Sequence, residues 1–213
     1  MIRNYKNANE AFQSIYRLIS VYGLESANTK YIKNFGFYID NPLTNRITNS
    51  LRNWKIDYAI KEWEWYVSGD NNAIEIAKHA KIWLNCMDEN GNVNSNYGWH
   101  WNQNNQIKYI VDELTENKES RRASISIYNS KDRYNFKNDT PCTYAINFYI
   151  ENETLCMSVL MRSNDLWYGF CNDQFCFSKL QKCIANELNL NVGSYYHFAN
   201  DMHIYKNFLN KNI

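Results

Sequence analysis

The chain is poor in the residues that interrupt regular structure, with seven glycines and two prolines among 213 residues. Long disordered linkers are rich in such residues, so extended linkers are not expected. No apolar run approaches the roughly 20 residues that a membrane-spanning helix needs. The first 20 residues are too polar and mixed for a secretory signal. We therefore expect one domain, residues 1–213, in a cytoplasmic protein that binds no membrane.

The chain also lacks an excess of charge of either sign, because 23 Lys and Arg balance 22 Asp and Glu. A net charge of +1 gives no general attraction to nucleic acid, so direct nucleic acid binding is not expected. The six cysteines have no CxxC or other metal-binding spacing. We expect free thiols in a reducing compartment and no metal site.

The apolar patterning predicts helices over residues 5–22, 54–69 and 107–114, and a long helix after Asp173. In the second helix, Ile56, Ala59, Ile60, Trp63 and Val67 form the expected buried stripe, and Glu62 lies beside it. Period-two patterns predict strands over residues 120–129, 143–150, 154–161 and 194–205, with an extended segment at 30–41 and a loop region at 84–106. Helices and strands are mixed without strict βαβ alternation, so the predicted class is α+β.

Cys142 is the first candidate for chemistry, because it follows Pro141 and opens a predicted strand. A cysteine there can be a small buried hydrophobe or a thiolate nucleophile, and a nucleophile needs nearby positive charge. Arg162 ends the next strand, and pairing of the two strands would place it opposite Cys142. The hairpin therefore predicts that Arg162 lies beside the thiol.

Other candidates have two readings each. Arg121 and Arg122 can be a solvated strand edge or a phosphate clamp. Asp165 and Asp173 can be helix N-caps or ligand contacts. His203 and Tyr205 share one face of a strand, as a surface pair or as part of a site. Glu62, in a Trp-rich helix, can be a satisfied polar group or a carboxyl with a raised pKa.

Taken together, the segments PCTYAINFYI, RSNDLWYGFCND and DMHIY resemble the thymidylate synthase family. That family has a Pro-Cys nucleophile, an Arg-Ser-x-Asp element 20 residues later, a base-reading residue after 11 more, and a late Asp-x-His-x-Tyr. All of these intervals hold here. SRR at 120–122, KEWEWYVSGDNN, KIW at 81–83 and NSNYGW at 94–99 also resemble family segments. The resemblance covers roughly residues 50–205. It implies a mixed β-sheet flanked by helices and a homodimer formed through the sheet.

The base-reading position distinguishes branches of the family. Most thymidylate synthases have Asn there, and this chain has Asp173. A carboxylate accepts from the amino group of cytosine and, with one shared proton, can also hold ring nitrogen 3. Against uracil it would bury two acceptors facing each other. The resemblance is therefore closest to the phage-type deoxycytidylate (dCMP) 5-hydroxymethylases, which implies a role in phage DNA base modification and a location in the host cytoplasm.

The resemblance implies folate-dependent transfer of a one-carbon group, with 5,10-methylenetetrahydrofolate as co-substrate. Cys142, Glu62 and Asp173 are the expected catalytic residues. Arg162, Ser163 and Gly169 are expected to contact the nucleotide, His203 and Tyr205 the sugar, and Asp165 and Trp83 the folate. Arg121 and Arg122 are expected to reach the phosphate of the partner subunit. The family's N-terminal phosphate-binding arginine has no clear counterpart in the sequence, and Lys30 is a weak candidate for its place.

Several positions depart from the family. Thr143 stands where thymidylate synthases usually have His, Cys86 replaces a second Trp, and Cys171-Asn172 replaces Pro-Phe. The chain ends eight residues after Tyr205, so the C-terminal segment that closes over folate in the synthases is expected to be absent, which favours addition of water over reduction. Methylation or hydroxymethylation of dUMP or CMP, and a nucleotide-binding protein without turnover, remain the alternatives.

Overall fold

The structure is a computed structural model that describes residues 3–136 and 138–209. The predicted domain of residues 1–213 also includes residues 1, 2, 137 and 210–213, which lie outside the described part. In chain order the elements are β1 (Arg3–Tyr5), α1 (Ala8–Tyr22), β2 (Leu24–Glu25), β3 (Thr29–Ile39), α2 (Ile56–Ser68), α3 (Ile74–Ala77), α4 (Trp83–Cys86), α5 (Tyr97–Asn102), η1 (Gln103–Asn105), α6 (Gln106–Glu116), β4 (Ser124–Ser126), η2 (Ser130–Tyr134), β5 (Thr143–Glu151), β6 (Thr154–Met161), β7 (Asn164–Asp165), α7 (Gly169–Glu187), β8 (Asn191–Tyr205) and η3 (Lys206–Phe208).

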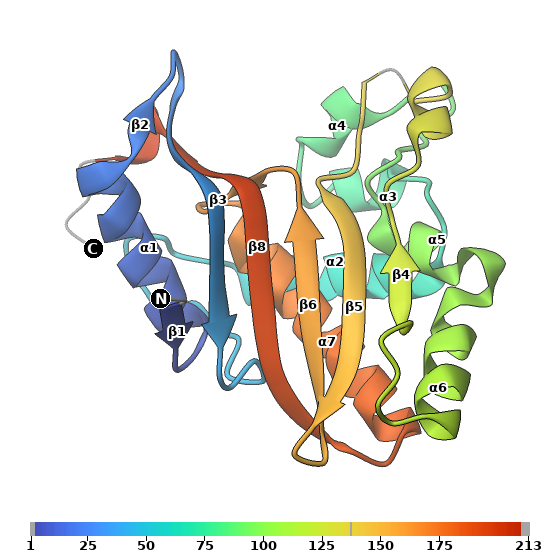
Figure 1. Ribbon diagram of the computed structural model, residues 1–213. Coiled ribbons are helices and arrows are strands. Elements are labelled where there is room, and N and C mark those ends of the chain that lie inside the picture. The colour runs from blue at the N-terminus through green and yellow to red at the C-terminus, as the bar shows by residue number, and fades with distance from the viewer. Residues whose placement is uncertain (1–2, 137, 210–213) are drawn as a thin grey trace.

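The described strands form one mixed sheet in the order β1-β3-β8-β6-β5-β4, with β2 paired to β3 and β7 paired to β8 (Figure 1). The β1–β3, β6–β8 and β7–β8 pairs are parallel, and the other pairs are antiparallel. This mixture confirms the predicted α+β class. The long strand β8 occupies the middle of the sheet, so residues near its C-terminal end are held by neighbours on both sides.

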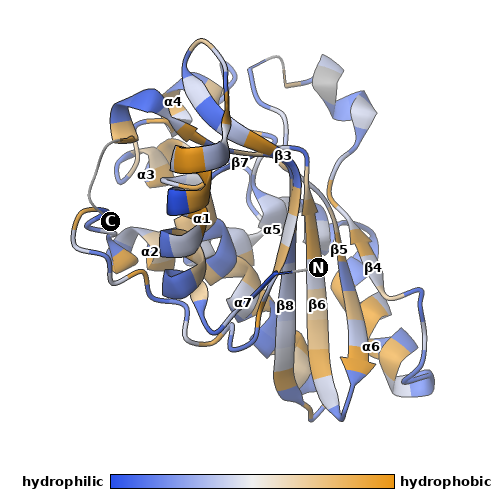
Figure 2. Cartoon of the chain, turned by 60° about the vertical axis from the view of Figure 1, so that its left-hand side comes forward, coloured by the Kyte–Doolittle hydropathy of each residue, from blue (hydrophilic) through white to orange (hydrophobic). Residues whose placement is uncertain are grey.

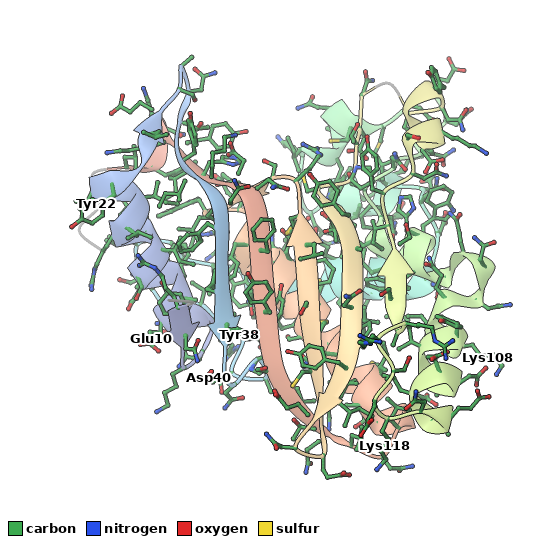
Figure 3. All side chains as sticks on the ribbon, viewed as in Figure 1. Glu10, Tyr22, Tyr38, Asp40, Lys108 and Lys118 are labelled. Atoms are coloured by element: carbon green, nitrogen blue, oxygen red, sulfur yellow. The ribbon has the colours of Figure 1, made fainter. Side chains whose placement is uncertain are left out.

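The helices gather on one face of the sheet. Figure 1 shows α2 and α7 behind the central strands, and the turned view in Figure 2 shows the same helices to one side of β8 and β6. No described helix covers the face turned toward the viewer in Figure 1. Aromatic side chains lie on that open face, Tyr38 among them (Figure 3), and the Tyr38 and Tyr196 rings are 4.8 Å apart. The molecule therefore has one buried and one open sheet face.

Several local predictions are confirmed. Residue Gly69 ends α2 in the left-handed conformation, with φ of 65° and its N–H bonded to the Tyr66 carbonyl, as expected for a helix C-cap. The hairpin between β5 and β6 closes over Asn152 and Glu153, whose φ angles are 50° and 56°. Such left-handed two-residue turns match the twist of antiparallel strands, which fixes the register of the hairpin.

The predicted buried stripe of α2 is wrong in part. Glu62 lies on the buried face with Ala59 and Tyr66, whereas Ile60 and Val67 are exposed. The reason is tertiary: α2 packs against α5 and α7, and the face that meets them carries a small residue and polar groups rather than the larger aliphatic side chains. Apolar periodicity alone therefore placed Ala59 correctly and Ile60 and Val67 on the wrong side of the helix.

Three further boundaries differ from expectation. The predicted loop at 84–106 contains α4, α5 and η1, because the Asn96 side chain caps α5 and lets Tyr97 and Trp101 be buried. The predicted strand at 120–129 is reduced to β4, so Arg121 and Arg122 precede it. Helix α7 begins at Gly169, so Asp173 lies inside the helix and is not its N-cap. None of the described helices is long and apolar enough to cross a bilayer.

Candidate functional site

A cleft of about 410 Å³ lies where α2, α7 and the C-terminal ends of β6 and β8 meet. Among the residues predicted for the site, those that line it are Glu62, Trp83, Cys142, Arg162, Ser163, Asp165, Gly169, Asp173, His203 and Tyr205. A larger cavity of about 670 Å³ opens between α2, α6 and α7, and its described lining includes none of these residues. We therefore place the candidate site in the smaller cleft, where titratable groups converge.

Strand pairing brings Arg162 to Cys142. Thr143 pairs with Met161, and the Arg162 N–H donates to the Cys142 carbonyl at 2.7 Å. The Arg162 guanidinium donates from Nε to the Pro141 carbonyl at 2.9 Å and from Nη2 to the Thr140 carbonyl at 2.8 Å. The predicted proximity of Arg162 and Cys142 is therefore confirmed, and two of the five guanidinium N–H donors anchor the segment that precedes the cysteine.

The expected lowering of the Cys142 pKa by Arg162 does not prevail. Burial raises the pKa of the thiol to about 11, the Arg162 charge lowers it, and the Asp173 carboxylate raises it further. Desolvation disfavours the thiolate more than the Arg162 guanidinium favours it. The unliganded chain thus holds Cys142 as a thiol at neutral pH.

Glu62 is connected to two aromatic residues of the cleft wall. The Tyr58 hydroxyl donates to Glu62 Oε1 at 2.8 Å, and the Trp83 indole N–H donates to the Tyr58 oxygen at 3.0 Å. Tyr58 and Glu62 are four residues apart on α2, so they share one face of the helix. Trp83 therefore contacts the site through Tyr58, and this relay fixes which oxygen of Glu62 accepts a hydrogen bond.

Two carboxyl groups of the cleft have pKa values near neutral pH. Burial, and then the Asp173 charge, raise the pKa of Glu62 to about 8, against the lowering effect of the Tyr58 hydrogen bond. Burial raises the pKa of Asp173 to about 7, against the lowering effect of the Asn164 hydrogen bond. Both groups can therefore gain or lose a proton near pH 7, as acid and base residues of active sites do.

The Asp173 carboxylate is oriented by a hydrogen bond from one neighbouring side chain. Asn164 Nδ2 donates to Asp173 Oδ2 at 2.6 Å. Gly169, which is one helical turn before Asp173, leaves the space for this contact: a Cβ there would lie 3.0 Å from Asn164 Nδ2 and 3.3 Å from Asp173 Oδ2. The glycine predicted to contact substrate thus also permits the hydrogen bond that orients the predicted base-reading residue.

Asp165 has a structural use. Its two carboxylate oxygens accept the N–H groups of Trp167 at 3.0 Å and Tyr168 at 3.1 Å, just before α7 begins. Burial raises the pKa of Asp165, and these two hydrogen bonds lower it. Asp165 is therefore not the N-cap of α7, which is Tyr168, but it holds the turn before that helix, and any contact with folate would be additional.

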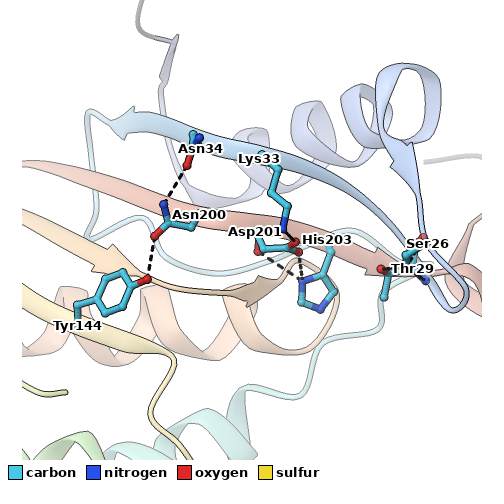
Figure 4. Close-up of polar contacts among 8 residues, drawn as sticks. All are labelled: Ser26, Thr29, Lys33, Asn34, Tyr144, Asn200, Asp201 and His203. Atoms are coloured by element: carbon cyan, nitrogen blue, oxygen red, sulfur yellow. Dashed lines mark hydrogen bonds and ion pairs between the residues drawn. The ribbon is translucent and has the colours of Figure 1, made fainter. Parts of the chain in front are cut away.

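Strand β8 contributes His203 and Tyr205, the two residues expected to meet the sugar, to the cleft wall. His203 and Tyr205 lie on one face of the strand with ring centroids 5.5 Å apart. Asp201 lies between Lys33 and His203, and its Oδ1 is 3.1 Å from His203 Nδ1 (Figure 4). This contact orients the imidazole so that Nε2 is the edge left to meet a ligand, a role of Asp201 that the sequence patterns did not indicate.

The arginine doublet and Lys30 do not enter the cleft of their own chain. Arg122 forms an ion pair with Glu113 at 3.0 Å on the exposed side of α6, and Arg121 is exposed. Neither lines the cleft, which agrees with their expected action on a partner subunit without testing it. Lys30 donates to the Ser20 carbonyl at 2.7 Å, a structural bond between β3 and α1.

The sequence reading missed Tyr58, Asn164 and His197. Tyr58 had a usable signal, because it precedes Glu62 by one helical turn. Asn164 belongs to the RSND segment, residues 162–165, and the resemblance of that segment to the family was the available signal. His197 is fully buried between two phenylalanines and gives no sequence signal that separates it from an ordinary core residue.

The positions that depart from the family have ordinary local roles. Thr143 is buried at the start of β5, and Cys171 is buried in α7. Asn172 Oδ1 accepts the Trp54 indole N–H at 2.8 Å, which joins α7 to the segment before α2. Burial raises the pKa of Cys86 to about 11, so this thiol stays protonated at neutral pH. None of the six cysteines, all of them described, forms a disulfide.

Comparison with known proteins gives a consistent result. The family model described as thymidylate synthase matches residues 22–212. Thymidylate synthases of Buchnera aphidicola subsp. Acyrthosiphon pisum, strains Tuc7 and 5A, are each 31% identical over 157 residues, covering 70% of this chain. The chain spans 59% of the length of these curated relatives. The solved structure of thermostable thymidylate synthase A from Bacillus subtilis shares the fold, with a TM-score of 0.75 and 23% sequence identity. The match covers 93% of this chain and 80% of the Bacillus subtilis chain.

Proposed function

The chain belongs to the thymidylate synthase family, and we propose that it transfers a one-carbon unit to carbon 5 of dCMP to give 5-hydroxymethyl-dCMP. The observation that carries the choice of base is Asp173. A carboxyl group, bonded to Asn164 and with a pKa of about 7, lines the cleft that also contains Cys142. Such a group complements the amino group and the bare ring nitrogen of cytosine better than the carbonyl of uracil.

In the proposed reaction the Cys142 sulfur bonds to carbon 6 of the ring, and carbon 5 becomes the nucleophile. The proton held between Asp173 and ring nitrogen 3 stabilises the charge that develops there. 5,10-Methylenetetrahydrofolate supplies the one-carbon unit. Once carbon 5 has bonded to that unit, loss of the carbon 5 proton and departure of tetrahydrofolate leave an exocyclic methylene. Water adds to this carbon, and the sulfur leaves from carbon 6. Glu62 holds and moves the protons of this sequence and orients the water.

The walls of the cleft fit a nucleoside monophosphate. Arg162, which bonds the Cys142 carbonyl, and Ser163 line the cleft and would hold the phosphate, and His203 and Tyr205 line it from β8 and would meet the sugar hydroxyl. A planar guanidinium is suited to bidentate contact with phosphate. Arg121 and Arg122 would complete the phosphate site from a partner subunit. The open, partly aromatic sheet face with Tyr38 supports dimerisation through the sheet.

A second cavity, of about 450 Å³, adjoins the cleft and shares Tyr58, Tyr168 and Asn172 with it. Its lining includes Trp54 for stacking of a flat ring, and Arg52 and Lys55 for carboxylates. These residues fit a folate co-substrate, with Trp83 and Asp165 at the boundary toward the nucleotide. We place the reaction in the cytoplasm.

A second candidate function, methylation of dUMP, is favoured by the names of the curated relatives. Tritium release from carbon 5 of labelled dCMP and dUMP, with and without methylenetetrahydrofolate, measures the choice of base. Product mass separates hydroxymethyl from methyl. We expect tritium release from dCMP, and only when methylenetetrahydrofolate is present. The product should carry a hydroxymethyl group. A methylated dUMP product would support the second candidate, and no release from either nucleotide would support a binding protein without turnover.

The variant Asp173→Asn tests the assignment of the base-reading residue. An amide can donate as well as accept, so it no longer penalises uracil. Removal of an unpaired buried acceptor pair is worth about 1–3 kcal/mol, so the ratio of kcat/KM for dCMP to that for dUMP should fall about 5- to 150-fold. Unchanged base selectivity in this variant would refute the assignment.

A further inference from the structure

Asp173 is the end of a chain of four side chains that runs into the core. The Tyr195 hydroxyl is 2.8 Å from His197 Nδ1, and His197 Nε2 is 3.1 Å from Asn164 Oδ1. Asn164 Nδ2 completes the chain at 2.6 Å from Asp173 Oδ2. Tyr195 and His197 are fully buried and Asn164 is nearly so. The fold holds this chain in place through the pairing of β7 with β8.

The donors and acceptors in this chain can be assigned in one direction. A carboxylate only accepts, so the Asn164 amide must present its NH₂ to Asp173 and its oxygen to His197. His197 must then carry its proton on Nε2 and accept at Nδ1, which requires Tyr195 to donate. Burial lowers the pKa of His197 to about 3, so the imidazole is neutral and has one proton to place. Every hydrogen bond therefore points toward Asp173.

We propose that Asn164, held by His197 and Tyr195, is a positioning residue that sets which oxygen of Asp173 carries the proton shared with the pyrimidine, and so selects cytosine. This inference rests on the proposed function of Asp173. It assigns a specificity role to three residues that lie outside the expected catalytic and binding set.

The Asn164 hydrogen bond makes the two oxygens of the Asp173 carboxyl group unequal. The carbonyl oxygen of a carboxylic acid is a better hydrogen-bond acceptor than its hydroxyl oxygen. Donation from Asn164 to Oδ2 therefore favours placing the proton on Oδ1. In that form Oδ1–H can donate to ring nitrogen 3 of cytosine, and Oδ2 can accept the amino group with its second lone pair. Uracil needs the opposite arrangement, with a donor at Oδ2, which the Asn164 bond disfavours.

The surroundings of the chain leave it little freedom. The His197 ring stacks on Phe37 at 5.2 Å and meets Phe170 edge-on at 5.3 Å. Gly169 supplies the space beside Asn164 Nδ2 that any side chain would fill. An interior polar chain with all its partners satisfied is rigid and specifies one arrangement. The described ionisable groups that interact with Asp173 by charge are Glu62, Tyr66, Tyr97, Cys142, Asp165, Cys171, Cys176 and Tyr195.

Three variants of the full chain test the proposal: Asn164→Leu, His197→Phe and Tyr195→Phe. Each is assayed for kcat/KM with dCMP and dUMP by tritium release as a function of pH. We expect Asn164→Leu to lower the dCMP to dUMP ratio at least 10-fold. In the pH profile of kcat/KM for dCMP, the limb assigned to Asp173 should also move to higher pH. The Asn164 hydrogen bond lowers the pKa of Asp173 in the wild type, and this variant lacks it. His197→Phe should act in the same direction with a smaller effect, and Tyr195→Phe should have the smallest.

Gln181→Leu is the matched control. Gln181 is buried in α7 and donates to the carbonyls of Leu155, Gly193 and Ser194, away from the cleft. This variant should lose thermal stability without a change in base ratio or pH profile. If Asn164→Leu and His197→Phe likewise lose stability but keep the wild-type dCMP to dUMP ratio and pH profile, the hydrogen-bonded side chains have only a structural role and the inference is overturned. If the wild type itself prefers dUMP, the proposed function fails first, and the inference fails with it.

Discussion

Replacement of Glu62 by Gln is expected to stabilise the fold at alkaline pH while it removes activity. The carboxyl lies in the cleft wall with 5% of its surface exposed, and burial is the main reason that its pKa rises from an ordinary 4.5 to about 8. Such a group binds its proton more tightly in the folded chain than in the unfolded chain. Its contribution to stability is therefore complete below about pH 4.5 and is lost as the pH rises toward 8.

The magnitude follows from the same values. Each pH unit between the unfolded and folded pKa is worth about 1.4 kcal/mol, so the wild type should lose up to about 4 kcal/mol between pH 5 and pH 8 through this group. Relaxation and water penetration reduce such desolvation penalties in proteins, so we expect roughly 2–3 kcal/mol. Glutamine keeps the size of the side chain, and its carbonyl oxygen can accept the Tyr58 hydroxyl as Glu62 Oε1 does.

The assay is urea unfolding at pH 5 and pH 8, followed by tryptophan fluorescence. The free energy of unfolding should fall less between the two pH values in Glu62→Gln than in the wild type. Glu64→Gln is the control, because Glu64 is exposed on the same helix and its pair with Lys61 at 2.7 Å contributes little. Equal losses in Glu62→Gln and the wild type would show that Glu62 is already solvated, which would refute the reasoning.

Three other changes are predicted. Cys142→Ser should abolish tritium release while nucleotide still binds in calorimetry, and substantial residual exchange would mean that another group is the nucleophile. Tyr58→Phe removes the hydrogen bond that lowers the pKa of Glu62, so the pH limb assigned to Glu62 should move about 1 unit higher, which a pH–rate profile measures. Gly169→Ala places a methyl group 3.0 Å from Asn164 Nδ2, so base selectivity should fall several-fold in the two-nucleotide assay, and an unchanged ratio would show that the contact can adjust.

The sequence predicted the parts of the site that depend on local pairing. The hairpin between β5 and β6 was clear from alternating residues, and its register alone placed Arg162 beside Cys142. The strand over 194–205 was also predicted, so His203 and Tyr205 were expected on one face. These features need only period-two patterning and a short turn, which the sequence carries directly.

The parts that failed depend on which surfaces meet in three dimensions. Glu62 was placed beside the buried stripe because Ile60 and Val67 are more apolar, yet those side chains are exposed. The role of Asn164 depends on His197, which is 33 residues away and reaches it only because β7 pairs with β8. Long-range polar contacts of this kind leave no periodic signal, so they become visible only in the folded chain.

Base recognition and activation of the nucleophile are coupled through charge in the proposed site. The negative charge of Asp173 opposes ionisation of the Cys142 thiol, whereas the Arg162 charge favours it. A pyrimidine that shares a proton with Asp173 neutralises that carboxyl and removes the negative charge that opposes thiolate formation, so the Arg162 charge lowers the pKa of the thiol more effectively. Cytosine, with a bare ring nitrogen, can take part in this sharing, and uracil, with an N–H there, cannot. The nucleotide that fits the base-reading carboxyl is thus the one that makes the thiolate easier to form, and discrimination between bases would appear in the rate of the chemical step as well as in binding.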